Sequence, residues 1–218
     1  AWQMSMPPAQ LGCTYFNFTA SHDGIGMRPA EGLLSEEDIQ RVIDTAEKFG
    51  GRLSMRKMPD GSTRTYEINI ALFDALKGTI EGEDDWNIER FLCSQIIAMG
   101  LEGIPGFYIH SLLATGNDHD GVEKSGHNRA INRHRWHYPD LLAQLDDPDS
   151  RHARVFNALT AILKTRSEQA AFHPNATQFT LQLGEPFFGF WRQSIDRSQS
   201  IFAIHNLTNK PVSIPLMS

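Results

Sequence analysis

Hydrophobic and polar residues alternate in two different ways along the chain, and the change falls near residue 174. Before it, segments with apolar residues at helical spacing are separated by short apolar or alternating runs, a pattern typical of mixed helices and strands. After it, only short alternating runs occur, which predict strands at 178–183, 187–193 and 201–205. For the first part we predict strands at 14–19 and 103–113, a hairpin of strands 52–58 and 62–68, and helices at 35–49, 71–76, 86–100 and 152–171.

The predicted helix at 35–49 has the best-defined ends. Ser35 can cap its first turn, Asp38 lies at the third helical position, where an acidic residue is favourable, and Gly50-Gly51 ends it. The run at 103–113 opens with Gly-Ile-Pro-Gly and predicts a strand buried on both faces, as in a parallel sheet. The polar stretch 114–135 is predicted to be a loop, and loops of that length are typically functional or disordered.

The order strand, helix, strand, helix, followed by strands alone, predicts an α/β fold. Parallel βα units would occupy residues 1–173, and a small antiparallel β domain residues 174–218. Two βα units cannot close a sheet, and the sequence has no initial methionine. We therefore expect these residues to be part of a longer polypeptide.

Composition narrows the classes of function. The 218 residues are 40% hydrophobic and 21% charged, with a formal net charge of −6 and no long basic run, so we predict no nucleic-acid partner. The longest apolar run, 91–100, is about half of what a membrane span requires. Residues 1–4 do not resemble the start of a signal peptide, and Cys13 and Cys93 are interpreted as buried free thiols, so we predict a cytoplasmic protein without a membrane partner.

Several groups of polar residues could carry chemistry. His22-Asp23 follows the first predicted strand, where a carboxylate could be catalytic, although the pattern alone favours an Asp-Gly turn. Asp118 and Asp120 match only the first part of a calcium loop, and the histidines lack zinc-site spacing, so no metal is predicted; these histidines are His119, His127, His134 and His137. The segment 129–136, RAINRHRW, is either a solvated basic patch or a place where a guanidinium binds sugar hydroxyls and a carboxylate.

Three separate motifs resemble those of one family and occur in the order expected for it. They are FNFTASHDGIGMRPAEGLL, YEINIALFDAL, and GIPGFYIHSLLATGNDHDGVEKSGHNRAINR. They are similar to the last part of sucrose phosphorylase-type members of the α-amylase superfamily, and most of all to the glucosylglycerate phosphorylase branch. The resemblance implies strands 7 and 8 of a (β/α)8 barrel with their helices, followed by part of a C-terminal antiparallel β domain. It also implies a glucoside and inorganic phosphate as small-molecule partners, and no cofactor.

The resemblance assigns roles to individual residues. Asp23 would be the carboxylate that stabilises the transition state by binding the hydroxyls at C2 and C3 of the glucosyl ring, which fits an oxocarbenium-like transition state. His22 would hold a nearby hydroxyl, and Arg133 the 4-hydroxyl side of the −1 subsite.

On the acceptor side, Tyr66 and Glu67 fall where sucrose enzymes carry a tyrosine and a glutamine on a mobile loop. Glu67 departs from that glutamine, which argues against sucrose as the donor. Arg28 and Arg64 lie on the same predicted loops and would suit an anionic acceptor such as glycerate, or the attacking phosphate.

The family cleaves with retention, which requires an aspartate nucleophile and a glutamate acid/base. Neither motif is found among the 218 residues, so we expect this chain alone to be inactive. Three alternatives remain open: a sucrose phosphorylase or hydrolase of the same branch, a non-catalytic carbohydrate-binding module, and a homo-oligomer formed through an exposed apolar barrel surface.

Overall fold

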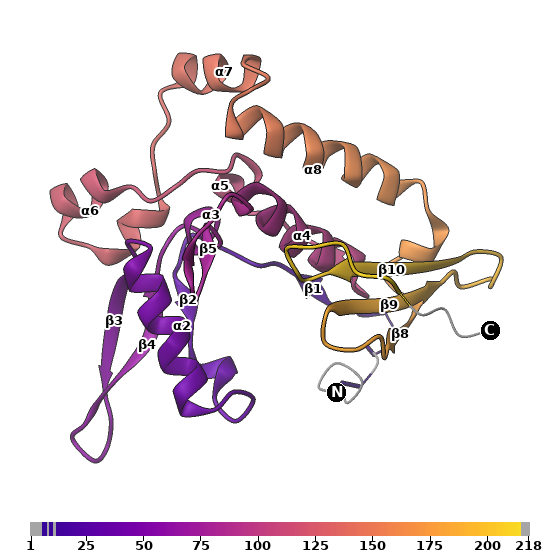
Figure 1. Ribbon diagram of the computed structural model, residues 1–218, viewed down its shortest axis with the longest axis horizontal. Helices are drawn as coiled ribbons and strands as arrows, with labels where there is room; N and C mark the ends of the chain where they lie inside the picture. Colours follow the sequence, from indigo (N-terminus) through magenta and orange to yellow (C-terminus); the bar gives the residue numbers. More distant parts are fainter. Residues whose placement is uncertain (1–5, 8, 11, 215–218) are drawn as a thin grey trace. The chain divides into compact units, whose positions relative to one another are not determined.

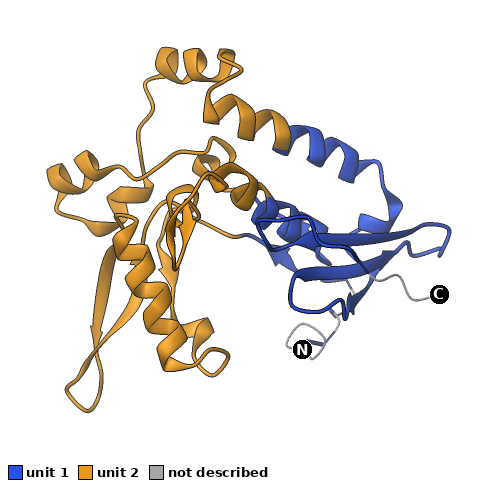
Figure 2. Ribbon diagram, in the orientation of Figure 1, with its two compact units in different colours: residues 1–18, 93–106, 159–218 blue, residues 19–92, 107–158 orange. Residues whose placement is uncertain are grey.

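The structure is a computed structural model that describes residues 6, 7, 9, 10 and 12–214. Residues 1–4, on which the expectation about a signal peptide rests, lie outside that set. The chain divides into two compact units, residues 1–18, 93–106 and 159–218, and residues 19–92 and 107–158 (Figure 2). The division into residues 1–173 and 174–218 stays a prediction.

The second of these units, unit 2, contains a three-stranded antiparallel sheet in the order β2-β4-β3 and the helices around it (Figure 1). Its elements are β2 (Ile25–Gly26), η1 (Arg28–Ala30), α2 (Glu36–Lys48), β3 (Arg52–Lys57), β4 (Thr63–Asn69), α3 (Leu72–Ala75), β5 (Gly78–Thr79), β6 (Gly82–Glu83), α5 (Ile109–Leu112), α6 (His119–Ser125), η2 (Asn128–Asn132) and α7 (Tyr138–Asp146), together with the first part of α4 (Asn87–Gly100) and of α8 (Arg151–Ser167).

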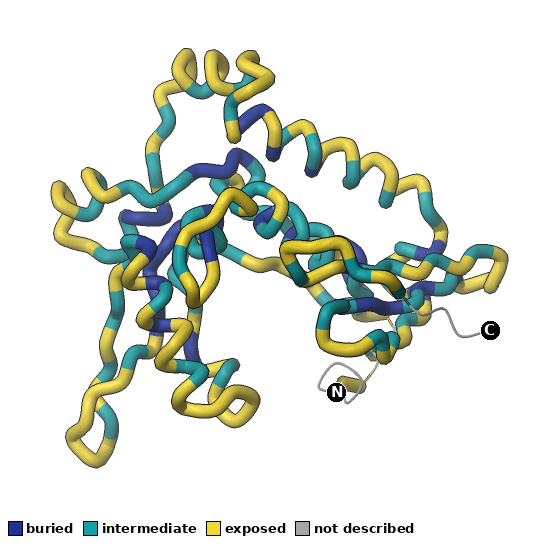
Figure 3. The backbone as a smooth tube through the Cα atoms, in the orientation of Figure 1, coloured by how far each residue is buried: buried dark blue, intermediate teal, exposed yellow. Residues whose placement is uncertain are grey.

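The core of unit 2 forms where α2 packs against this sheet. Ser35 caps α2, and its Oγ accepts a hydrogen bond from the Asp38 amide at 3.1 Å, as predicted. The buried residues that α2 and the sheet share are Met27, Ile43, Ala46, Phe49, Ile68 and Ile70 (Figure 3). The predicted hairpin is confirmed, with β3 paired to β4 across the turn at residues 58–62. The central strand of the sheet is β4, which lies between β2 and β3 and has its last residues buried.

Unit 1 contains a second three-stranded antiparallel sheet, in the order β10-β9-β8. Its elements are β1 (Phe16–Asn17), β7 (Ile104–Pro105), η3 (Ala170–Phe172), β8 (Thr177–Leu181), β9 (Phe187–Gln193) and β10 (Ser200–Asn206), with the last parts of α4 and α8. The three strands confirm those predicted after residue 174. Phe190 and Arg192 of β9 are fully buried, and the Arg192 guanidinium donates hydrogen bonds to the Gly100 and His173 carbonyls, both at 2.8 Å.

The prediction of a long buried strand at 103–113 is wrong. The only strand within 103–113 is β7; it pairs in parallel with β1, and the exposed fractions of Phe16 and Ile104 are 65% and 46%. Gly103 has φ +115, and Pro105 lacks the N–H that a continued ladder needs. The residues beyond turn instead into α5, where the Leu113 amide donates to the Ile109 carbonyl.

Two further expectations are corrected. The polar segment 114–135 is not a structureless loop, because it contains α6 and η2. Asp118 caps α6 by accepting from the Gly121 amide at 2.7 Å, and Gly126 ends it with φ +69. Both cysteines are free, but Cys13 is exposed rather than buried, and Cys93 is partly buried.

Candidate active site

The His22-Asp23 pair lies on a turn of unit 2 that is held by an amide side chain from η2. Nδ2 of the buried Asn132 donates hydrogen bonds to the Ser21 carbonyl at 2.6 Å and to the Asp23 carbonyl at 3.3 Å. The Asp23 amide donates to Ser21 Oγ at 3.2 Å, which closes the turn. Residues more than 100 positions apart in the sequence therefore fix the backbone that carries the predicted catalytic carboxylate.

Gly24 lets this turn pass directly against β4. A Cβ at this position would lie 2.5 Å from the Ile68 carbonyl oxygen and 2.6 Å from Glu67 Cγ, so a larger residue does not fit. Immediately afterwards β2 pairs with β4, with Ile25 opposite Ile68 and Gly26 opposite Glu67. The turn and the middle of β4 are thereby brought into contact.

Two guanidinium groups converge on one oxygen of Asp23. Arg129 Nη1 lies 2.8 Å and Arg133 Nη2 lies 3.3 Å from Asp23 Oδ1, and His22 Nε2 lies 3.6 Å from the same oxygen. Arg133 is also anchored by Nε, which donates to the His22 carbonyl at 2.8 Å. The Asp23 side chain is 38% exposed, so part of the carboxylate faces solvent.

Glu67 supplies a second carboxylate to this cluster. Arg129 donates from Nε to Glu67 Oε1 at 3.0 Å and from Nη2 to Oε2 at 2.7 Å, a bidentate pair of the strong, charge-assisted kind. The hydrogen bonds that Arg129 donates to Glu67, together with the charges of Glu67 and Asp23, raise the pKa of Arg129 above its ordinary value. The guanidinium therefore remains charged between the two acids.

Tyr108 completes the support behind the turn. Its hydroxyl donates to the backbone carbonyl of Asn132 at 2.7 Å, and burial raises the pKa of this phenol, with Arg133 acting in the opposite direction. The sequence drew attention to the arginines around Asn132, but it carried no signal for Tyr108. That residue was part of a run predicted to be a buried strand.

The remaining predicted site residues lie elsewhere in unit 2. Tyr66 precedes Glu67 on β4 at the point where the register with β3 shifts, and 36% of its surface is exposed. Arg64 Nη1 lies 3.6 Å from Glu36 Oε1 at the first residue of α2, and Arg28 begins η1. In the described part of the chain, neither arginine contacts Asp23.

A cavity of about 1070 Å³ adjoins the arginine cluster. It is lined by residues of α6, η2 and the segment after it, with Ser54 of β3. The ionisable lining residues are Asp118, Asp120, Lys124, His127, Arg129, Arg133, His134 and Arg135. Arg129 and Arg133 thus face both Asp23 and this cavity, whose wall is predominantly basic.

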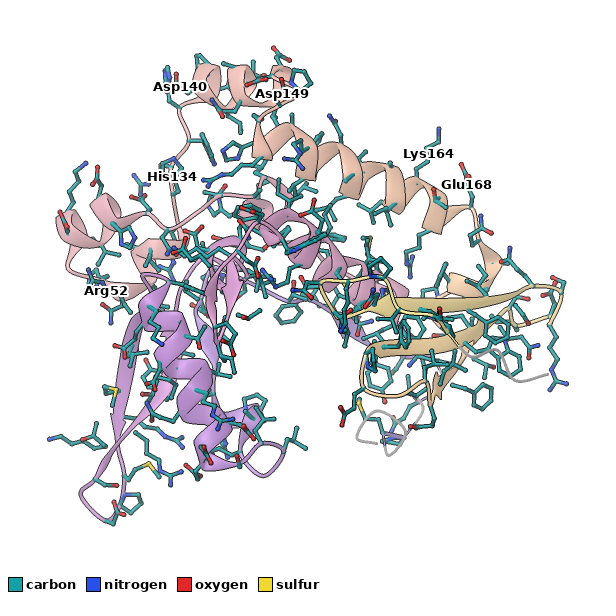
Figure 4. The ribbon with its side chains drawn as sticks, in the orientation of Figure 1. Arg52, His134, Asp140, Asp149, Lys164 and Glu168 are labelled. Carbon is teal, nitrogen blue, oxygen red and sulfur yellow. The ribbon has the colours of Figure 1, made fainter. Side chains whose placement is uncertain are left out.

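His134, labelled in Figure 4, lines the cavity and contacts the residue that caps α6. Its Nδ1 lies 3.1 Å from Asp118 Oδ2, the carboxylate that caps α6. Across residues 6–214, apart from 8 and 11, no three His, Cys, Asp or Glu side chains are grouped closely enough to hold a metal ion. The same residues contain no helix with the length and apolarity to cross a bilayer.

Comparison with known proteins finds similarity to glucosylglycerate phosphorylases. The one from Allomeiothermus silvanus is 46% identical over 178 residues, which cover 81% of this chain and 32% of the relative. Those from Spirochaeta thermophila and Escherichia coli are 37% and 36% identical over 90% and 83% of this chain. The chain thus spans about a third of the length of these relatives. No family model matches it.

Similarity extends more weakly to sucrose enzymes. Sucrose phosphorylase of Bifidobacterium adolescentis is 26% identical over 70% of this chain. The crystal structure of sucrose 6F-phosphate phosphorylase from Thermoanaerobacter thermosaccharolyticum superposes with a TM-score of 0.61 over 90% of this chain and 40% of that one, at 22% identity. The chain therefore shares the fold of that part of the sucrose enzyme.

Proposed function

Because the chain is a homologue of glucosylglycerate phosphorylases and, at lower identity, of sucrose phosphorylases, we propose that the natural polypeptide containing it is a retaining glucoside phosphorylase. It would transfer glucose from 2-O-α-glucosylglycerate to inorganic phosphate, in the cytoplasm. The observation that carries this choice is the difference in sequence identity, which is 36–46% to the glucosylglycerate phosphorylases and 26–29% to phosphorylases of the sucrose type.

In this proposal Asp23 stabilises the transition state. An oxocarbenium-like sugar gains from a carboxylate whose hydrogen bond to a ring hydroxyl strengthens as positive charge develops. The geometry supports that role, since two guanidinium groups hold Oδ1 and the carboxylate stays partly exposed. His22 lies on the turn that carries Asp23, and Arg133 directly follows η2. Both side chains would bind neighbouring hydroxyls of the sugar.

The acceptor-side and architectural assignments belong to the same proposal. Tyr66, Arg28 and Arg64 would lie near the glycerate or phosphate rather than the glucosyl ring, and among the described residues neither Arg28 nor Arg64 contacts Asp23. The parallel pair β1 and β7 would correspond to barrel strands 7 and 8. Retention needs a nucleophile and an acid/base, and these two carboxylates would come from parts of the polypeptide other than this chain.

The test is phosphorolysis by the natural gene product that contains these residues. Release of glucose 1-phosphate is measured with glucosylglycerate and with sucrose, and Asp23→Asn is the inactive control. We expect kcat/KM to favour glucosylglycerate by at least tenfold, about 1.4 kcal/mol of discrimination. A preference for sucrose would assign the chain to the sucrose branch. Glucoside binding without turnover would indicate a carbohydrate-binding module.

A further inference from the structure

Glu67 is an unusual residue for the middle of a sheet. It lies on the central strand β4 with 5% of its surface exposed, between β2 and β3. A buried carboxylate is costly unless a charged partner satisfies it. Both Glu67 oxygens are satisfied by Arg129, through Nε at 3.0 Å and Nη2 at 2.7 Å.

This pairing leaves one edge of the Arg129 guanidinium for another acid. A guanidinium is planar and rigid, so fixing Nε and Nη2 also fixes the position of Nη1. Nη1 lies 2.8 Å from Asp23 Oδ1. Arg129 therefore links Glu67 of β4 to the carboxylate of Asp23.

The second guanidinium strengthens the same arrangement. Arg133 reaches Oδ1 at 3.3 Å while its Nε is bonded to the His22 carbonyl at 2.8 Å. Asp23 Oδ1 thus forms ion pairs with both arginines. Within the described residues, the ion pairs of Asp23 with His22, Arg129 and Arg133 are all made through Oδ1.

We propose that Glu67 and Arg129 are positioning residues that hold Asp23 Oδ1 and thereby present Oδ2 to the hydroxyls of the substrate. This inference rests on the proposed glucoside chemistry of Asp23. It gives Glu67 a role different from contact with the acceptor, because both its carboxylate oxygens are already bonded to Arg129. Glu67 acts on the glucosyl side of the site, through Arg129.

Three variants of the natural gene product test the positioning role: Glu67→Gln, Arg129→Lys, and the two combined. Glutamine keeps the shape of Glu67 but offers one acceptor and one donor, so the two-point hold on Arg129 is lost. Lysine keeps the charge of Arg129 without the planar fork. Glu31→Gln is the matched control, because Glu31 pairs with Arg56 at 3.1 Å in the same unit without reaching Asp23.

We expect kcat to fall on the order of 10²-fold in Glu67→Gln and in Arg129→Lys, since small misplacements of a catalytic group have that effect. KM for phosphate should change by less than about threefold, and the ratio of glycerate to fructose as acceptors should stay constant. The double variant should be about as slow as the slower single variant, because both changes interrupt one chain of contacts. The Glu31→Gln control should keep the kcat of the parent protein.

A crystal structure of Glu67→Gln supplies a readout that does not depend on turnover. We expect Arg129 Nη1 to have left hydrogen-bond distance of Asp23 Oδ1. An unmoved Arg129, independent effects in the double variant, or an altered acceptor ratio with unchanged kcat would each overturn the positioning role. If Asp23→Asn is inactive in those cases, the proposed function still stands. If the parent protein phosphorolyses no α-glucoside, the proposed function fails, and the crystal structure alone decides whether Glu67 holds Arg129 on Asp23.

Discussion

Removal of the Asn132 amide should loosen the turn that carries Asp23. The side chain is buried, and its Nδ2 donates to the Ser21 and Asp23 carbonyls at 2.6 and 3.3 Å. In Asn132→Ala both carbonyls lose their donor, and the Ser21 carbonyl is left in a partly buried place. Two lost bonds and one poorly satisfied acceptor cost about 2–3 kcal/mol. We expect Tm of the natural polypeptide to fall, and to fall by less per kcal/mol than in a domain of about 200 residues, because the relatives of this chain are about three times longer than it.

Asn132→Asp sharpens the test because it changes charge while keeping shape. The introduced carboxylate would face two carbonyl oxygens at the distances of the lost hydrogen bonds, so it should destabilise more than alanine at neutral pH. Its protonated form can donate one bond, which raises its pKa in the folded protein above the ordinary value of about 3.9. A group with a raised folded pKa gives stability below that pKa and loses it as pH rises. The defect of Asn132→Asp should therefore shrink on acidification.

The assay is thermal unfolding followed by circular dichroism at pH 5 and pH 8, with glucose 1-phosphate release measured in parallel. Asn128→Ala is the matched control, because Asn128 lies in the same 3₁₀ helix and donates one bond to the Leu53 carbonyl at 3.0 Å, away from the Asp23 turn. We expect the control to lose about 1 kcal/mol and to retain activity. Equal stability of Asn132→Ala and the parent protein, or an Asn132→Asp defect that is independent of pH, would refute the reasoning.

Three further predictions concern packing and buried polar groups in the two units. Gly24→Ala should destabilise by about 1–3 kcal/mol through the clash with the Ile68 carbonyl, whereas Gly26→Ala, with no atom within 4 Å of the added Cβ, should be tolerated in the same thermal melts. Arg192→Met should lower the free energy of unfolding by about 3 kcal/mol, measured by urea denaturation, because buried carbonyls lose a charged donor; burial lowers the pKa of Arg192 to about 10, so it is still charged at neutral pH. Burial also lowers the pKa of His152 below 6.5, so its contribution is present above pH 6.5 and lost as pH falls through the folded value; His152→Gln should flatten the pH dependence of Tm between pH 7 and 5, and an unchanged slope would contradict this.

The predictions that succeeded rest on local signals. The cap at Ser35 and the two glycines after residue 49 define α2, and a Pro-Asp-Gly turn defines the β3–β4 hairpin. The strands after residue 174 were predicted by their alternation and form one antiparallel sheet. In each case the residues that decide the element lie within a few positions of it.

The predictions that failed depended on long-range contacts or on the conformation of single residues. Apolar residues at 103–113 are compatible with a strand or with a buried helix, and the structure has a short piece of each, β7 and α5. At the site, the meeting of Asp23 with Arg133 was implied by the family resemblance. The Arg129–Glu67 pair was not, because it joins residues 62 positions apart whose contact arises only when β4 lies between β2 and β3.

The β3–β4 hairpin has consequences for protein engineering that follow from its two ends. Its tip, residues 58–62, is exposed or partly exposed. The amides of Met58, Gly61 and Ser62 donate hydrogen bonds to acceptors within the turn, so insertions there should be accommodated. Its base carries Glu67. Grafting a whole hairpin from a homologue with another residue at position 67 would remove that acid together with the tip, and so would disturb Arg129 and the turn that carries Asp23. Chimeras intended to change substrate choice should be cut between these two regions.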